Sequence, residues 1–359
     1  MALCDPRVIK QADILVNYSL KVKKGERVIV IGDISSKPLV LEIYRQLIKA
    51  GASEVRIKFD SYEFAEIYFK EATDNQLLVF PDVEVDEMKK MDCYIRIGSS
   101  TNTRGLTSVD GERIAKRSKV MAPITDYRVE KTRWVVTRFP TESQAQEADM
   151  SLSEYENHVF DAITKTDWKN VFKDQEKLRK LIDKTRVVRI IGPQTDLTMS
   201  VAGRIAENAG GHFNMPDGEV FTSVVEDSTE GHITYTYPAL YAGKEFHKVS
   251  LEFKNGKVVR ATAEKGEADL NKLLNVDKGA RIIGELGIGN NFQIKKFTKD
   301  ILFDEKIGGT IHIALGRGYT ETKSKNNSAL HWDMIKDLRL GGELWFDKKM
   351  VQKNGKWLI

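Results

Sequence analysis

A histidine and an aspartate near the carboxy end of the chain are spaced so that they could act together. The segment "SALHWDMI" (328–335) places His331 and Asp333 on either side of Trp332. Side chains alternate between faces in an extended strand, so His331 and Asp333 would share a face and Trp332 would point the opposite way. An imidazole and a carboxylate on one face of an apolar strand could form a hydrogen-bonded pair or could bind a metal ion together.

Four further residues with metal-binding side chains occur in similar apolar or glycine-rich segments. His312 lies between two isoleucines in "GGTIHIALG", and Glu285 lies in "RIIGELGIG". Glu219 follows a Pro-Asp-Gly turn in "NMPDGEVFTS", and Glu305 precedes the His312 segment in "ILFDEKIGG". A carboxylate that faces an apolar core is costly unless it is paired or bound to a cation. The whole set would suit Zn²⁺ or Co²⁺, and a bridging carboxylate could hold two ions roughly 3.5–4 Å apart.

Ordinary structural roles would also account for these residues. A strand histidine can be a hydrogen-bonded core residue, and Glu285 could be buried against an arginine such as Arg281. Tyr319, after "GRG", could donate a hydrogen bond to an oxyanion beside a metal pair, or could be an ordinary aromatic residue at a strand end. The sequence has no His-Glu-x-x-His motif, so any metal site must be assembled from distant segments.

The first half of the chain alternates strand-like and helical segments. Residues 26–33 ("ERVIVIGD") and 54–59 predict buried strands, and residues 35–51 predict a helix between them. Strand, helix and strand within about 30 residues is a βαβ unit, which requires parallel pairing. Ser151 and Glu154 form a capping box that predicts a helix start. Further strands are expected at residues 93–98 and 119–124, and further helices at residues 151–163 and 167–184.

The second half is rich in strand-like segments joined by turns. Residues 231–266 predict a β-meander, and Asn255-Gly256 and Asn354-Gly355 predict hairpin turns. We therefore predict an α/β protein with two domains. An N-terminal open α/β domain would span residues 1–185, and a mainly antiparallel β, α+β domain carrying the metal site would span residues 186–359.

Composition and missing motifs limit the classes of protein that the chain could be. The formal net charge of +4 gives no reason to expect a nucleic acid or an anionic membrane as a partner. Two cysteines, Cys4 and Cys93, without a Cys-x-x-Cys motif argue against a disulfide framework. The sequence contains no phosphate loop, dinucleotide fingerprint or nucleophile elbow. With no signal-peptide pattern and no membrane-spanning stretch, we expect a soluble, cytoplasmic protein.

Four segments in this order resemble the thermophilic aminopeptidase family of metallopeptidases, to which aminopeptidases T and S belong. They are "FNMPDGEVFTS" (213–223), "GELGIGNN" (284–291), "ILFDEKIGGTIHIALGRGY" (301–319) and "SALHWDMI" (328–335). The resemblance is dense over residues 186–347 and weaker in the first half, where "MSLSEYENHVFDAI" (150–163) fits. It implies an exopeptidase that uses two metal ions to remove the amino-terminal residue of a peptide.

The resemblance also implies a role for each candidate residue. The metal ligands would be Glu219, Glu285, Glu305, His312, His331 and Asp333. Glu285 would bridge two divalent ions and is a candidate to accept the proton of the attacking water, and Tyr319 would assist at the oxyanion. The ions would be Zn²⁺ or Co²⁺, with Mn²⁺ or Mg²⁺ as alternatives. The partners would be peptides with a free amino terminus and, because family members are dimers, a second copy of the chain.

A protein that keeps this scaffold without turnover is the alternative. It would bind a small metabolite or a metal ion and would hydrolyse nothing. The presence of all six presumptive ligands argues against this alternative. Assays of an aminoacyl substrate with and without Zn²⁺ or Co²⁺ would distinguish the two.

Overall fold

The computed structural model describes residues 5–359, which form two compact units. The first unit comprises the chain up to Lys165 together with Gly211–Pro216, and the second comprises Thr166–Gly210 and Asp217–Ile359. Cys93 is buried with a free thiol, whereas Cys4 lies outside the described residues. Among residues 5–359, no helix combines the length and apolar character needed to cross a bilayer.

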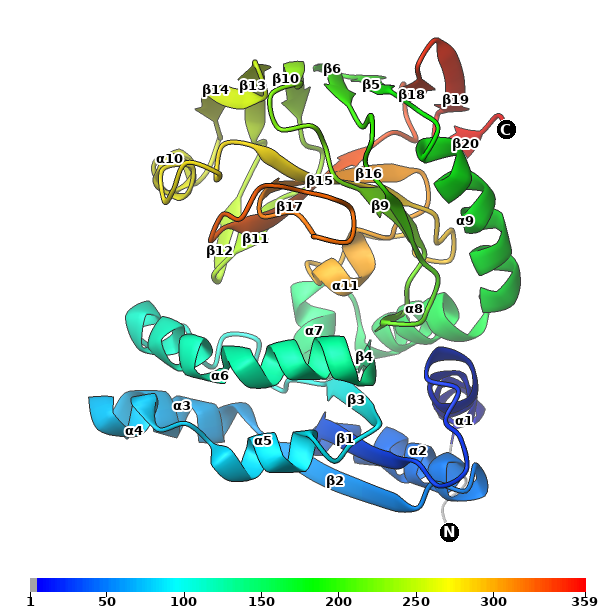
Figure 1. Cartoon of the computed structure of the whole chain (residues 1–359), viewed down its shortest axis with the longest axis vertical. Helices are drawn as coiled ribbons and strands as arrows, with labels where there is room; N and C mark the ends of the chain where they lie inside the picture. The colour runs from blue at the N-terminus through cyan, green and yellow to red at the C-terminus, as the bar shows by residue number, and fades with distance from the viewer. Residues whose placement is uncertain (1–4) are drawn as a thin grey trace. The chain divides into compact units, whose positions relative to one another are not determined.

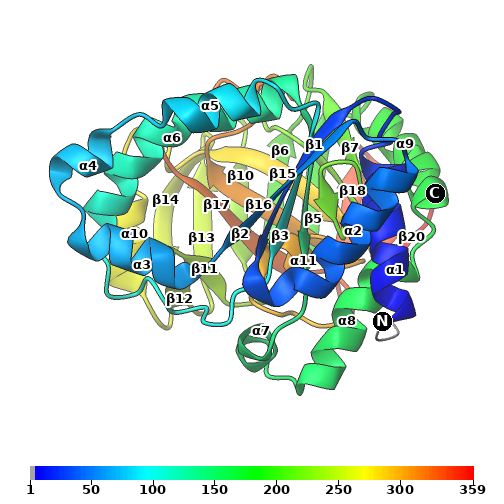
Figure 2. The same cartoon turned by 90° about the horizontal axis from the view of Figure 1, so that it is seen from below.

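The first unit is built on a parallel sheet with the strand order β2-β1-β3-β4-β8. Its strands are β1 (Arg27–Asp33), β2 (Glu54–Asp60), β3 (Cys93–Gly98), β4 (Arg133–Arg138) and β8 (Asn214–Met215). Its α-helices are α1 (Pro6–Asp13), α2 (Lys37–Lys49), α3 (Tyr62–Glu71), α4 (Asp74–Leu78), α5 (Asp82–Met88), α6 (Gly111–Lys131), α7 (Glu142–Glu147) and α8 (Leu152–Thr164). Figure 2 shows α1 and α2 side by side. The predicted parallel βαβ unit and the Ser151–Glu154 capping box are confirmed.

The prediction of a strand at residues 119–124 is wrong, because this segment lies inside α6. Asp110 caps the helix by accepting a hydrogen bond from the backbone N–H of Glu112. Ile124 is the one fully buried residue of α6, whereas a central parallel strand would be buried on both faces. The position beside β3 is taken by β4, whose segment "RWVVTR" the sequence reasoning missed.

The second unit contains two large antiparallel sheets and one two-stranded sheet, which confirms its predicted mainly antiparallel character. The eight-stranded sheet has the order β14-β13-β10-β6-β5-β18-β19-β20. Its strands are β5 (Val187–Gly192), β6 (Thr195–Ser200), β10 (Glu230–Thr234), β13 (Ser250–Lys254), β14 (Lys257–Thr262), β18 (Glu343–Phe346), β19 (Lys349–Lys353) and β20 (Lys356–Trp357). The Asn255-Gly256 and Asn354-Gly355 pairs have positive φ at both residues, as hairpin turns of this kind require.

The five-stranded sheet of the second unit has the order β17-β16-β15-β9-β7. Its strands are β7 (Ala206–Ala209), β9 (Glu219–Thr222), β15 (Ile283–Gly289), β16 (Thr310–Gly316) and β17 (His331–Asp337). The remaining elements are α9 (Trp168–Ile182), α10 (Glu267–Leu273), α11 (Ile301–Asp304) and the small hairpin β11 (Ala239–Tyr241) and β12 (Lys244–Phe246). Figure 1 shows α11 close to β15 and β16.

The two faces of the five-stranded sheet have opposite character. Leu286 and Ile288 of β15 and Ile311 and Ile313 of β16 join one buried apolar cluster with side chains of the eight-stranded sheet. The alternate residues of the same strands must point to the opposite face. That opposite face, which we call the polar face, therefore receives the acidic and imidazole residues of these strands.

Candidate metal centre

Six acidic and imidazole side chains meet on the polar face of the five-stranded sheet. They are Glu219 on β9, Glu285 on β15, Glu305 directly after α11, His312 on β16, and His331 and Asp333 on β17. Their ligand atoms form three overlapping groups, and within each group all atoms lie within 4.8 Å of one another. The groups are Glu219–Glu285–His312, Glu285–His331–Asp333 and Glu305–His312–Asp333. The structure thus brings together all six residues that the sequence singled out as ligands.

Strand register explains why these side chains meet. Ala314 pairs with Glu285 on one side and with Asp333 on the other, so a small side chain separates the two carboxylates. His312 pairs with Gly287. A Cβ atom built on Gly287 would lie 1.9 Å from Cε1 of His312, so the imidazole ring occupies the space that a side chain would need. Gly287 of the "GELGIG" segment therefore makes room for a ring, rather than for a phosphate group.

Both histidines are oriented through Nδ1. Nδ1 of His312 lies 3.1 Å from the backbone oxygen of Glu305, and Nδ1 of His331 lies 2.8 Å from that of Arg317. A carbonyl oxygen can only accept, so Nδ1 carries the proton and Nε2 of the neutral ring has a free lone pair. Both Nε2 atoms face carboxylates of the cluster. A backbone carbonyl that fixes the remote nitrogen is the usual support of a metal-binding histidine.

Nε2 of each histidine contacts two carboxylates. Nε2 of His312 lies 3.2 Å from Oε1 of Glu285 and 3.4 Å from Oε2 of Glu219. Nε2 of His331 lies 3.3 Å from Oδ2 of Asp333 and 3.9 Å from Oε2 of Glu285. The two oxygens of Glu285 therefore face two different histidines, which is the geometry expected of a bridging carboxylate.

Burial dominates the electrostatics of the carboxylates. Glu219 is 6% exposed and Glu285 is 5% exposed. Burial raises the pKa above the ordinary glutamate value for three carboxyl groups, those of Glu219, Glu285 and Glu305. Asp333 differs: burial is the largest single influence and would raise its pKa, but the hydrogen bond to His331 and the positive charges nearby together outweigh burial and lower it. The cluster concentrates more negative charge than a buried site can hold without cations.

The same charges act in the opposite sense on the histidines. Burial alone would lower the pKa of His312, but its hydrogen bond to Glu285 and the charge of Glu219 outweigh burial and raise it to about 10. The hydrogen bond and charge of Asp333 likewise raise the pKa of His331 to about 10 against burial. In the metal-free protein, a proton on Nε2 of each imidazole thus offsets part of the negative charge of the carboxylates. Nε2 is also the nitrogen to which a metal ion would bind.

The residues present fit divalent metal ions. Oε2 of Glu219 is buried without a hydrogen-bond donor, which is costly for a carboxylate oxygen unless a cation binds it. Carboxylate oxygens and imidazole nitrogens are ligands of Zn²⁺ and related ions. Arg281 does not neutralise Glu285, because its guanidinium donates to the backbone oxygen of Val258 and to Asn275. The buried arginine pair considered from the sequence is therefore not formed.

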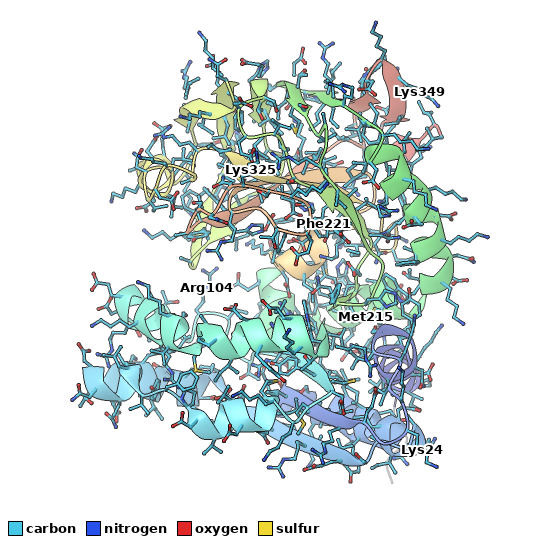
Figure 3. The ribbon with its side chains drawn as sticks, viewed as in Figure 1. Lys24, Arg104, Met215, Phe221, Lys325 and Lys349 are labelled. Atoms are coloured by element: carbon cyan, nitrogen blue, oxygen red, sulfur yellow. The ribbon has the colours of Figure 1, made fainter. Side chains whose placement is uncertain are left out.

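Tyr319 lies at the edge of the cluster. Its ring centroid is 5.6 Å from that of His331 and 5.5 Å from that of Phe221, which Figure 3 labels on β9. The Tyr319 residue is 46% exposed. Partial burial and the nearby carboxylates, Glu285 first among them, raise the pKa of the phenol, so the hydroxyl stays protonated and can donate a hydrogen bond. Sequence reasoning did not single out Phe221, although it lies two residues after Glu219 and so shares its face.

Lys306 is a second residue of the cluster that sequence reasoning missed. It is 0% exposed, and its ammonium contacts Glu219 and Glu305. Burial would lower its pKa, but the charges of Glu219 and Glu305 outweigh burial and raise it. A lysine directly after a glutamate resembles an ordinary solvated pair in the sequence, so only the fold reveals that this one is buried.

The chain is similar to known proteins over nearly its whole length. Residues 4–357 match the family model described as thermophilic metalloprotease (M29). The chain is 26% identical to aminopeptidase 2 of Geobacillus stearothermophilus, in an alignment that covers 97% of each protein. It is 25% identical to aminopeptidase AmpS of Bacillus subtilis, which covers 96% of this chain and 97% of that protein. The solved structure of AmpT from Thermus thermophilus, at 22% identity, shares the fold with a TM-score of 0.87 over 98% of this chain and 99% of that one.

Proposed function

The chain belongs to the thermophilic metalloprotease family (M29). We propose that it is an aminopeptidase that holds two divalent metal ions in the cluster of six acidic and imidazole side chains described above. Relatives named as aminopeptidases, each aligned over nearly the whole chain, support this activity. Its substrates would be peptides with a free amino terminus. The working assembly would be a cytoplasmic homodimer, and light scattering of the purified protein tests the oligomeric part of this proposal.

The observation that carries the proposal is the position of Glu285. It belongs to two of the three ligand groups, and its two oxygens face His312 and His331 separately. A carboxylate shared by two groups of ligands is what a dinuclear centre needs. One ion would be held by Glu285 with Glu219 and His312, and the other by Glu285 with His331 and Asp333. Glu305 would complete the set beside His312 and Asp333.

The ions, when bound, would supply a water activated for attack and positive charge for the developing oxyanion. The chain's own residues would do the rest of the chemistry. Tyr319 would donate its phenolic hydrogen to the oxyanion, because its hydroxyl is protonated at neutral pH. Glu285 is the candidate acceptor for the proton of the attacking water, because its carboxylate belongs to two of the ligand groups and would lie beside a water held there. The Nδ1 contacts of His312 and His331 would hold both imidazole rings in place during the reaction.

A fluorogenic aminoacyl substrate tests the activity. We expect hydrolysis with Zn²⁺ or Co²⁺, loss of hydrolysis after chelation, and recovery when the metal is added back. The variant His331→Ala should lose hydrolysis and bind less metal. The matched control is His232→Ala, because His232 is an exposed histidine on β10 in the other sheet.

The metal content separates the proposal from its alternative. If the wild-type protein bound two ions per chain yet hydrolysed no aminoacyl substrate with Zn²⁺, Co²⁺, Mn²⁺ or Mg²⁺, the non-catalytic binding protein would be favoured. If it bound no ion, both the dinuclear centre and the mechanism above would be wrong.

A further inference from the structure

Lys306 places a permanent positive charge inside the cluster of carboxylates. Its side chain is fully buried, and Nζ lies 3.4 Å from Oε1 of Glu219 and makes a close ion pair with Oε1 of Glu305. A buried ammonium is costly unless it is paired, and here two carboxylates pair with it. A hydrophobic side chain of the same length would fill the space without this cost, so the charge itself needs an explanation.

The two carboxylates divide their oxygens between the ammonium and the rest of the cluster. Oε1 of Glu219 faces Lys306, whereas Oε2 faces Nε2 of His312 at 3.4 Å and has no hydrogen-bond donor. Oε1 of Glu305 is likewise taken by Lys306. Each of these two side chains therefore keeps one oxygen for a ligand other than the ammonium.

We propose that Lys306 is a positioning residue of the metal centre. It holds one oxygen of Glu219 and one of Glu305, so each carboxylate binds a metal ion through a single oxygen. It also keeps the two carboxylates in place when metal ions are absent. This inference rests on the proposed dinuclear centre, because it concerns how that centre is filled.

The test compares two buried lysines. Lys306→Met removes the ammonium and keeps an unbranched side chain that is only one atom shorter, and Lys306→Arg keeps the charge. The matched control is Lys336→Met on β17, because the Lys336 ammonium is also buried but donates to the backbone oxygens of Pro193 and Thr234. Each variant is purified metal-free and then loaded with Zn²⁺ alone.

Thermal unfolding is the first measurement. Lys306→Met should lower the melting temperature of the metal-free protein by at least about 5 °C more than that of the Zn²⁺-loaded protein, because Zn²⁺ replaces the lost cation. Lys336→Met should lower both melting temperatures equally. Lys306→Arg should behave like the wild type. Equal losses in both states of Lys306→Met would show an ordinary packing role and overturn the inference.

X-ray absorption at the zinc edge is the second measurement. With the ammonium removed, Glu219 and Glu305 can bind through both oxygens, so Lys306→Met should gain about one oxygen neighbour per zinc ion. An unchanged zinc environment would overturn the inference while leaving the dinuclear centre intact. A wild-type protein that binds no Zn²⁺ would overturn both. If Lys306→Met does not fold, Lys306→Leu removes both the charge and the hydrogen-bond donors, with the same expected results.

Discussion

The two faces of the five-stranded sheet differ although they are made by alternate residues of the same strands. On one face Leu286, Ile288 and Ile313 are buried in the apolar cluster shared with the eight-stranded sheet. On the polar face Glu285 and His312 are equally buried but belong to a cluster of charges. Burial stabilises the fold on the first face and costs free energy on the second. Equal burial therefore has opposite effects on the free energy of folding at the two faces. Substitutions on the apolar face should reduce stability, and substitutions on the polar face should reduce activity.

Glu285→Gln should have the largest effect and should act on catalysis. The amide has the shape of the carboxylate but can neither bridge two ions nor accept the proton, so kcat should fall by at least about a thousandfold. Metal content should fall with it, which elemental analysis would measure. The melting temperature of the metal-free variant should change less than kcat does, because the amide keeps the shape of the side chain and leaves three other carboxylates facing the histidines and Lys306. A variant that kept wild-type kcat would exclude Glu285 from the site.

Ile313→Ala should have the converse effect. It deletes buried methyl groups from the apolar face next to His312, and such deletions cost about 2–5 kcal/mol in the free energy of unfolding. Denaturant unfolding would measure this loss. At temperatures well below the melting transition the variant should bind metal and hydrolyse substrate as the wild type does. If activity were lost while stability was retained, the separation between the two faces would be broken.

Tyr319→Phe should act on the polar face without touching the ligands. Removal of the phenolic hydroxyl deletes one donor to the oxyanion, so kcat should fall about a hundredfold or more while KM changes little. Metal content and melting temperature should match the wild type. A lower metal content in this variant would assign Tyr319 to the ligand set instead.

A further expected effect is a pH dependence of the metal-free protein, which involves no substitution. In the folded state the pKa values of His312 and His331 are raised to about 10, above the ordinary histidine value of about 6.5. A raised folded-state pKa contributes stability that is fully present below about pH 6.5 and is lost as pH rises through about 10. The melting temperature of the metal-free protein should therefore fall over this range. With Zn²⁺ bound the fall should be smaller, because the ions bind the neutral rings. Calorimetry that found no fall would contradict the charge balance described for the cluster.

Much of this arrangement could be predicted from the sequence. Strand alternation placed His331 and Asp333 on one face and Trp332 on the other, and Trp332 is indeed buried against Phe246 at a ring-centroid distance of 4.7 Å. The convergence of all six ligand candidates rested on the resemblance to a family, because spacing alone does not specify register between strands that are distant in sequence. Their role as metal ligands and the domain boundary at residue 185 stay predictions.

The parts that were missed depend on tertiary contacts. The segment at residues 119–124 has a short apolar run that suits a strand or a helix equally. In the fold it is part of the helix α6, and periodicity alone does not distinguish the two. Lys306 has the sequence context of a surface lysine. In the fold, however, its ammonium pairs with Glu219, which lies 87 residues earlier in the chain. Composition and periodicity carry no information about such a pairing.

The imidazole ring that lies over Gly287 also limits which sequences this scaffold tolerates. Since even a methyl group there would collide with the ring, a library of all amino acids at residue 287, selected for growth on peptides, should return glycine alone. Residue 287 therefore cannot change in evolution as long as His312 is needed. A single alanine at residue 287 would offer a way to silence the enzyme without altering any of its proposed ligands.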